Sequence, residues 1–345
     1  MGCCISQPRY RPSNCHVSEK LVTKCRSFSS DPIWTLAGCS YVPSAVLVGD
    51  DDGNIFTFSY ADKKVHSKIN IGVPITRCKI PTKFKPTVEN PWFFAAGRDN
   101  SVSLFNLSSN NQIITKTHTF DPHNAAIYGL CCSQDGTWMC SGSRDYSLRK
   151  YDTETRKLIA SVAPRRNVVT DMCLFDGSSN SPMILQTSED LAINLWSDSL
   201  QLVSKFHVTN HFATSSCAVT SSLFATLHNG FSGAGGNLNI WDVRNPTFPV
   251  SSFSEHNERG NCVVTYDEDR LASVGADGSL ILYSISQNGG GVVAKVQLPG
   301  QGISLSTVHS TTNERSKIVA VGCDSGQVVF YQIFADNIAE ILRTE

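Results

Sequence analysis

The sequence predicts an all-β protein that folds as a single seven-bladed β-propeller. The first observation is a repeat in which Gly or Ser, then Asp, precedes an alternating run that ends in an aromatic residue. The seven aromatics are Phe58, Phe105, Tyr151, Trp196, Trp241, Tyr283 and Tyr331. They follow one another at intervals of 42 to 48 residues, which leaves room for about four short strands and their turns. The second observation is that only 17% of the 345 residues are charged, so the chain can fill a large apolar core.

Residues 1–18 are predicted to form a flexible tail, and residues 19–345 the propeller. The tail opens with MGCCIS, which satisfies the pattern for N-myristoylation at Gly2. One myristoyl chain binds a bilayer with an association constant of only about 10⁴ M⁻¹, so stable anchoring needs a second signal. Cys3 and Cys4 supply that signal as palmitoylation sites. We therefore expect a lipid-anchored protein at the cytoplasmic face of a membrane, and a chance Met-Gly start is the open alternative.

The strands of the ring can be placed blade by blade. In blades one and two we expect strands at 33–39, 45–49, 54–59, 75–80, 92–96 and 102–107. In blades four to seven we expect them at 168–175, 183–186, 192–196, 214–219, 223–226, 237–241, 262–266, 270–274, 279–285, 303–308, 318–322 and 327–333. Residues 45–48 are apolar in succession, as expected of a strand covered on both faces. Either segment 19–28 or segment 338–343 is predicted to supply the strand that closes the ring.

The third unit is the most regular, and it contains His123, Ser141, Asp145 and Tyr151. These residues occupy the positions of the His, Ser/Thr, Asp and Trp network of WD40 repeats, which the units resemble. We interpret the set as a structural network, in which each hydrogen bond contributes about 1 kcal/mol net. A catalytic triad is not expected, because no nucleophile elbow and no separate base with an orienting partner accompany it.

Between about residues 140 and 245 the resemblance narrows to the family of WD repeat-containing protein 31. It rests on the segments GSRDYSLRKYD, RNVVT and ILQTSED, and on NGF with the glycines that follow it. The resemblance implies a non-enzymatic factor that is associated with cilia and acts in ciliary trafficking. Composition and spacing carry no information about cilia, so this expectation depends on the resemblance alone.

Composition argues against several other kinds of site. A net charge of −1, from 29 basic and 30 acidic residues, provides no overall field for nucleic acid. The 13 cysteines are odd in number and no hydrophobic signal sequence precedes them, so we expect reduced thiols. There is no CxxC pair, and neither His207 nor His211 has an acidic or cysteine neighbour, so no metal or other cofactor is expected. Eight cysteines are predicted to be small core residues, namely Cys39, Cys78, Cys131, Cys140, Cys173, Cys217, Cys262 and Cys323.

The turn of blade five departs from the pattern, because NGFSGAGG at 229–236 replaces the compact Asp turn. Its glycines do not have the Walker spacing, and a strand follows instead of a helix N-terminus, so nucleotide binding is not expected. We expect a widened loop that presents Phe231 to a partner, and a loop folded back on the ring is the alternative.

The residues predicted to meet a partner lie in the loops that precede the blades and in the turns between second and third strands. These segments share one face in propellers of this class. The candidates are Arg98, Arg144, Arg165, Arg166, Glu189, Asn229 and Phe231. A guanidinium bonds a carboxylate at two points and is frequent at binding hot spots; ordinary blade-to-blade contacts are the alternative.

The sequence therefore predicts a monomeric, non-catalytic scaffold that is tethered to a membrane and binds protein partners, but no nucleic acid. Two other classes stay open. One is a soluble WD40 subunit of a cytosolic complex without a lipid anchor. The other is a propeller that binds a small ligand or catalyses a reaction.

Overall fold

The structure is a computed structural model, and it describes most of the propeller. The described residues are 23–25, 29–39, 44–83, 91–108, 113–164, 166–176, 181–208, 210–230, 235–285, 290–308, 317–334 and 338–344. The predicted tail, with Gly2, Cys3 and Cys4, lies outside the described residues, as do Arg165 and Phe231.

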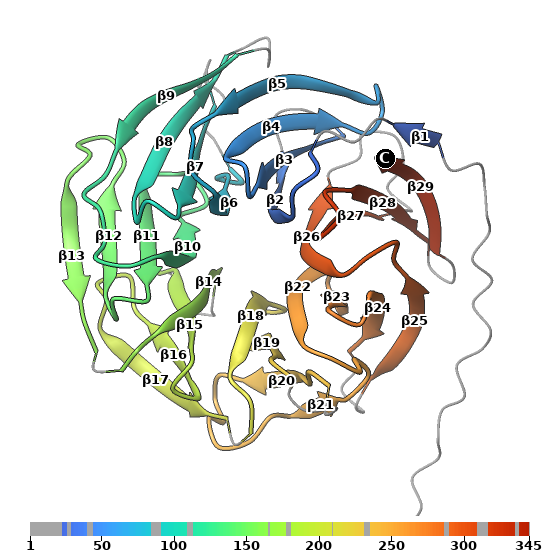
Figure 1. Cartoon of the computed structure of the whole chain (residues 1–345). Helices are drawn as coiled ribbons and strands as arrows, with labels where there is room; N and C mark the ends of the chain where they lie inside the picture. Colours follow the sequence, from blue (N-terminus) through green and yellow to red (C-terminus); the bar gives the residue numbers. More distant parts are fainter. Residues whose placement is uncertain are drawn as a thin grey trace, which may run out of the picture.

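Seven sheets are arranged like the blades of a ring (Figure 1), and the first strands of six blades line a central cavity, which we call the channel. Blade one contains β2 (Ile33–Cys39), β3 (Ala45–Asp50), β4 (Asn54–Ser59) and β5 (Lys64–Asn70). Blade two contains β6 (Ile75–Lys79), β7 (Trp92–Gly97), β8 (Val102–Leu107) and β9 (Ile114–Thr119). Blade three contains β10 (Ile127–Cys132), β11 (Trp138–Ser143), β12 (Leu148–Asp152) and β13 (Leu158–Val162). Blade four contains β14 (Val169–Phe175), β15 (Met183–Ser188), β16 (Ala192–Trp196) and β17 (Leu202–His207).

The remaining blades follow the same order, with the first strand of each nearest the channel (Figure 1). Blade five contains β18 (Ala213–Ala218), β19 (Leu223–His228), β20 (Leu238–Asp242) and β21 (Ser251–Phe253). Blade six contains β22 (Gly260–Asp267), β23 (Arg270–Gly275), β24 (Ser279–Ser284) and β25 (Gly291–Gln297). Blade seven contains β26 (Gly302–Val308), β27 (Lys317–Cys323), β28 (Val328–Ile333) and β29 (Ile338–Thr344), with β1 (Thr23–Cys25) at its outer edge.

Both ends of the described chain meet in blade seven (Figure 1). The C-terminal strand β29 pairs antiparallel with β28, and β1 pairs parallel with β29, with Thr23 opposite Leu342. Both predicted closing segments therefore take part. The C-terminal one supplies the fourth strand of the blade, and the N-terminal one adds a fifth that covers its open edge.

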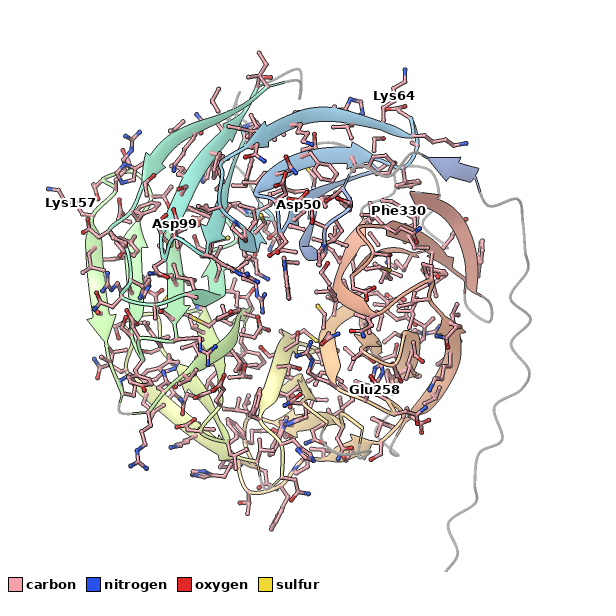
Figure 2. All side chains as sticks on the ribbon, in the orientation of Figure 1. Asp50, Lys64, Asp99, Lys157, Glu258 and Phe330 are labelled. Carbon is pink, nitrogen blue, oxygen red and sulfur yellow. The ribbon has the colours of Figure 1, made fainter. Side chains whose placement is uncertain are left out.

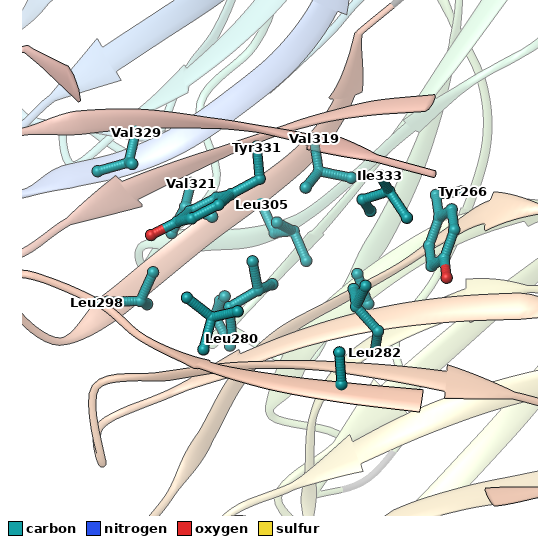
Figure 3. Packing of buried hydrophobic residues seen from close by; sticks show 14 of the residues in the cluster. Tyr266, Leu280, Leu282, Leu298, Leu305, Val319, Val321, Val329, Tyr331 and Ile333 are labelled. Atoms are coloured by element: carbon teal, nitrogen blue, oxygen red, sulfur yellow. The ribbon is translucent and has the colours of Figure 1, made fainter. Parts of the chain in front are cut away.

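The apolar core is divided among the blade-to-blade interfaces. Each of the seven clusters of buried residues in the described part combines side chains from two neighbouring blades. Figure 3 shows the cluster between blades six and seven, where Leu280 and Leu282 pack with Val319, Val321 and Tyr331. Burying one such side chain contributes about 1.5–3 kcal/mol. The packing of each blade against the next therefore stabilises the ring as a unit.

Burial also explains the sequence pattern along each blade. Every residue of the middle strands β3 and β4 is buried, because both of their faces are covered. The repeat aromatics lie on the third strands and are at most 4% exposed. Outermost strands such as β5 and β13 are largely exposed, and Figure 2 shows Lys64 and Lys157 projecting from the outer edge of the ring.

The predicted fold class is confirmed. The structure is an all-β, seven-bladed propeller, and the described residues contain no helix. The strands predicted for blades one, two and four to seven begin and end within two residues of the observed ones.

Candidate functional site

The first strand of every blade contains a β-bulge at its second residue, next to one mouth of the channel. In each blade the pairing with the second strand skips this residue. A bulge leaves its extra residue unpaired and re-aims its side chain. We call these residues the bulge ring: Trp34, Thr76, Tyr128, Thr170, Thr214, Asn261 and Ile303. Six of them line a cavity of about 230 Å³ at the mouth.

A second ring surrounds the first. In every blade, the turn between the second and third strands donates a backbone N–H to the carbonyl of the residue just before the first strand, at 2.8–3.2 Å. The seven donors form the turn ring: Asp51, Arg98, Arg144, Glu189, Asn229, Ala276 and Asp324. Four of the predicted partner-binding residues therefore occupy equivalent positions on one face. We call the bulge ring and the turn ring together the channel-mouth face.

Neighbouring members of the turn ring pair with one another. Arg98 Nη2 lies 3.3 Å from Asp51 Oδ1, and its guanidinium stands over the Trp34 ring, 5.5 Å from the centroid. Arg144 Nη2 lies 3.5 Å from Glu189 Oε1. Exposed ion pairs of this kind contribute about 0–1 kcal/mol. Both arginines are thus blade-to-blade contacts, yet a ligand can compete for them at little cost.

An ion pair crosses the channel below the mouth. Arg77 on β6 lies 3.7 Å from Asp171 on β14, although blade three separates these strands in the chain. Arg77 also donates to the Thr170 carbonyl at 3.3 Å, and Asp171 accepts the Ser216 backbone N–H at 2.8 Å. These bonds satisfy the partly buried Arg77 and the buried Asp171, and both residues line the channel cavity below the mouth.

The cysteine prediction needs one correction. Cys173, Cys217 and Cys262 pack against blade cores, but they are also partly exposed and line a channel cavity of about 180 Å³. Burial raises the pKa of Cys173 to about 12, so its thiol stays protonated and is a poor nucleophile and metal ligand. In the described part of the chain, no group of three or more His, Cys, Asp or Glu is placed to hold a metal ion.

The His–Ser–Asp set of blade three forms a closed network. His123 Nδ1 donates to Asp145 at 3.1 Å, and the Ser141 hydroxyl donates to Nε2 at 2.8 Å. The hydroxyl of Tyr151, the fourth residue of the predicted network, donates to the Asp121 carbonyl at 3.1 Å. Ser141 is fully buried, so no substrate can reach its hydroxyl. The set fixes the turn and the preceding loop.

Burial and hydrogen bonds in this network shift the pKa values of Asp145 and His123. Burial alone would raise the pKa of Asp145, but bonds from the Ser147 hydroxyl and the Asn124 N–H outweigh it and lower the pKa to about 2. Burial lowers the pKa of His123, which keeps its imidazole neutral at physiological pH. Blade six repeats the arrangement with His256, which lies 3.0 Å from Asp277 and 2.7 Å from Ser273.

The structure identifies mouth residues that the sequence reasoning missed. Tyr128, Phe212 and Arg259 line the cavity with Arg144 and Glu189. Phe212 and Arg259 each immediately precede a first strand, so the repeat register contained a signal for them. Aligning the blades would have placed these residues beside the bulges.

The other predicted partner-binding residues lie differently. Arg166 is exposed in the loop before β14, at a φ of 60°, and is not among the residues that line the mouth cavity. Asn229 belongs to the turn ring but does not line the cavity either.

The described part of the chain contains no helix with the length and hydropathy needed to span a bilayer.

Comparison with known proteins agrees with this geometry. Residues 114–152, from the start of β9 to the end of β12, match the WD40 family, described as "WD domain, G-beta repeat". The chain is also similar to ribosome biogenesis protein YTM1 of Laccaria bicolor, with 29% identity over 175 residues. It is similar to ribosome biogenesis protein WDR12 homolog of Nematostella vectensis, with 26% identity over 176 residues.

Each alignment covers 49% of this chain, but only 37% and 40% of the two relatives. The solved structure described as "Structure of U3-55K" superposes with a TM-score of 0.70 at 12% identity, over 85% of this chain and 89% of that one. These matches do not support the narrower resemblance to the WD repeat-containing protein 31 family. They agree with the structure on the fold: the chain is a seven-bladed β-propeller, and residues 114–152 match a WD40 repeat.

Proposed function

We propose that this protein is a non-catalytic scaffold that joins other proteins into a complex through its channel-mouth face. The observation that carries the proposal is the mouth cavity, where aromatic and arginine side chains from different blades meet. Aromatic residues and arginine are the side chains that dominate binding energy at protein interfaces.

A catalytic role has less support. The His–Ser–Asp sets of blades three and six include Ser141 and Ser273, and both serines are fully buried. Their histidines are occupied by the hydrogen bonds that hold the turns in place. A nucleophile must reach its substrate, so these sets act on the fold and not on a ligand.

The complex we favour is a soluble assembly. Its support is the similarity to two proteins named for ribosome biogenesis, which extends over about half of this chain. We therefore propose that the protein acts as a subunit of a multiprotein assembly complex, and that ribosome biogenesis is the first process in which to look for it.

Affinity capture of the tagged, full-length chain tests the scaffold. Wild type is compared with Tyr128→Ala and Arg144→Glu, which alter the cavity, and with Arg244→Glu as a charge-matched control. Arg244 follows the third strand of blade five, at the opposite end of the strands, and its side chain is 75% exposed. We expect specific partners to be lost from both mouth variants and kept by the control. An unchanged partner set in all three variants would contradict the proposal.

Sedimentation tests whether the protein acts in ribosome biogenesis. In a sucrose gradient, a ribosome biogenesis factor co-sediments with pre-ribosomal particles, and the mouth variants shift to the top of the gradient. If the wild-type chain itself stays at the top, the ribosomal part of the proposal is wrong, while the scaffold role is tested by the capture experiment.

A second candidate is a scaffold tethered to the cytoplasmic face of a membrane, including that of a cilium. It is favoured by the MGCCIS segment, with Gly2 for myristate and Cys3 and Cys4 for palmitate. Metabolic labelling with a myristate analogue, followed by fractionation, tests it. We expect label and membrane association in wild type, loss of both in Gly2→Ala, and partial release in a Cys3→Ser/Cys4→Ser variant. A Gly2→Ala chain that remains with the membranes would exclude the anchor.

A further inference from the structure

The charges around the mouth cavity are unequal. Arg77, Arg144 and Arg259 line it, but Glu189 is the only acidic residue that does so among the described residues. Arg77 is held by Asp171 and Arg144 by Glu189. Arg259 is exposed and makes no ion pair with another described residue. Its Nε donates to Asn261 Oδ1 at 2.8 Å, which orients the guanidinium while both Nη groups remain for a ligand.

The same cavity has an apolar wall. Trp34, Tyr128, Phe212 and Ile303 line it, and all four are only partly buried. They are contributed by blades one, three, five and seven, so the wall surrounds the mouth. A large apolar side chain placed here would cover surface that the folded chain leaves in contact with water.

A strained turn lies beside this site. The residue two positions after the turn-ring residue has a positive φ in six blades, and in blades one, six and seven it is glycine. In blade three it is Tyr146, with a φ of 72°, and the residue is 44% exposed. An aromatic residue in this region is a conformational outlier, and such strain concentrates at binding sites. Packing does not account for an exposed tyrosine where glycine serves the fold better.

We propose that the channel-mouth face binds an acidic peptide segment of a partner protein, with a carboxylate beside an aromatic or large aliphatic residue. This inference rests on the proposed scaffold function. The carboxylate bonds to the Arg259 fork and competes with Glu189 for Arg144. The apolar residue enters the mouth against Tyr128 and Phe212. Tyr146 extends the contact surface across the turn of blade three.

A polyanion such as RNA fits this face less well. The turn ring places Asp51, Glu189 and Asp324 around the arginines, so a chain of phosphates would meet negative charge on leaving the mouth. A single carboxylate avoids that repulsion, because exposed charges farther apart than about 8–10 Å are screened at physiological salt. The arrangement therefore favours a short acidic element.

Selection from a phage-displayed library of random peptides on the purified full-length chain tests the proposal. We expect selected peptides to pair Asp or Glu with an aromatic or large aliphatic residue. Affinity for a fluorescein-labelled selected peptide, measured by polarisation, should fall about tenfold in Arg259→Gln, because one charge-assisted bond is lost. Arg244→Gln, the matched control at the opposite end of the strands, should bind like wild type.

Tyr146→Gly separates binding from folding. Glycine accepts the left-handed turn, so the melting temperature should stay within about 3 °C of wild type, while affinity for the same peptide falls at least about threefold. Lys63→Gly is the matched control, because Lys63 is exposed with a φ of 57° in the turn after β4, at the opposite end of the blade. It should leave affinity unchanged.

Three results would overturn the acidic-peptide proposal. They are a library that yields basic sequences or no binders, affinity that does not change in Arg259→Gln and Tyr146→Gly, and binding of labelled oligouridylate that is tighter than any peptide and lost in Arg259→Gln. If partners are nevertheless lost from Tyr128→Ala in affinity capture, the scaffold function stands and only the partner chemistry is wrong.

Discussion

Acid is predicted to weaken the propeller through His228 in blade five. Its Nδ1 donates to the His211 carbonyl at 2.7 Å, so in the neutral ring Nε2 is an acceptor. The Thr226 hydroxyl donates to Nε2 at 2.9 Å, and Trp241 Nε1 donates to Thr226 at 2.8 Å. A second proton would turn Nε2 into a donor, so the Thr226 hydroxyl could no longer donate to it. Burial accordingly lowers the pKa of His228 from 6.5 to about 4.

The size of the effect follows from proton linkage. Below pH 6.5 the unfolded chain binds a proton at this residue that the folded chain does not bind. The free energy of unfolding therefore falls as the pH drops from 6.5 to about 4, and this contribution stays constant below that. One pKa unit corresponds to about 1.4 kcal/mol. The difference between the two pKa values therefore lowers the free energy of unfolding by about 3 kcal/mol.

Urea denaturation of wild type and His228→Gln across this pH range measures the loss. Glutamine keeps a donor and an acceptor but does not titrate. At about pH 7.5 the variant should be less stable by about 1–2 kcal/mol, because a buried bond is weakened. The difference should disappear or reverse near pH 4.5, since only wild type loses stability at this position. Contributions from His123 are common to both chains and cancel. Parallel stability curves would refute the reasoning.

Three further predictions concern the blades and the channel. Gly142→Ala should cost about 1–3 kcal/mol in urea denaturation, because its Cβ would lie 2.5 Å from a sulfur atom of blade four; Gly291→Ala, with nothing within 4 Å, should be nearly neutral. Asp171→Ala should cost about 3 kcal/mol by the same assay, because Arg77 loses its partner in the channel; a cost near zero would show that water replaces the carboxylate. Cys173 should react with iodoacetamide far more slowly than a free thiol at about pH 8, since burial raises its pKa to about 12; rapid labelling in peptide mass spectrometry would contradict this.

The repeat made most of the fold predictable. An aromatic that recurs every 42 to 48 residues marks the third strand of each blade, because that strand is buried between neighbouring sheets. Apolar runs such as that of β3 indicate strands covered on both faces. Both signals depend on local pattern, so the bounds of the first three strands in blades one, two and four to seven followed from the sequence to within two residues.

The strand that closes the ring was harder to predict from the sequence. Segments 19–28 and 338–343 both alternate weakly, and the sequence left a choice between them. In the structure the two ends pair with each other, so no choice was required. Strand pairing between the ends of a chain depends on where the ring closes, which no local window contains.

The candidate site also contains residues that the sequence placed and residues that only the tertiary structure brought together. The sequence placed Arg98, Arg144 and Glu189 in equivalent turns, because these turns share a local signature, and it placed Asn229 in the divergent turn of blade five. Only the tertiary structure showed that Trp34, Tyr128, Phe212 and Arg259, each from a different blade, surround the channel mouth, and that Arg77 reaches Asp171 across it. Those neighbours are set by ring closure and by the bulge in every first strand. Both are properties of strand pairing around the ring, whereas the turn signature belongs to a few consecutive residues.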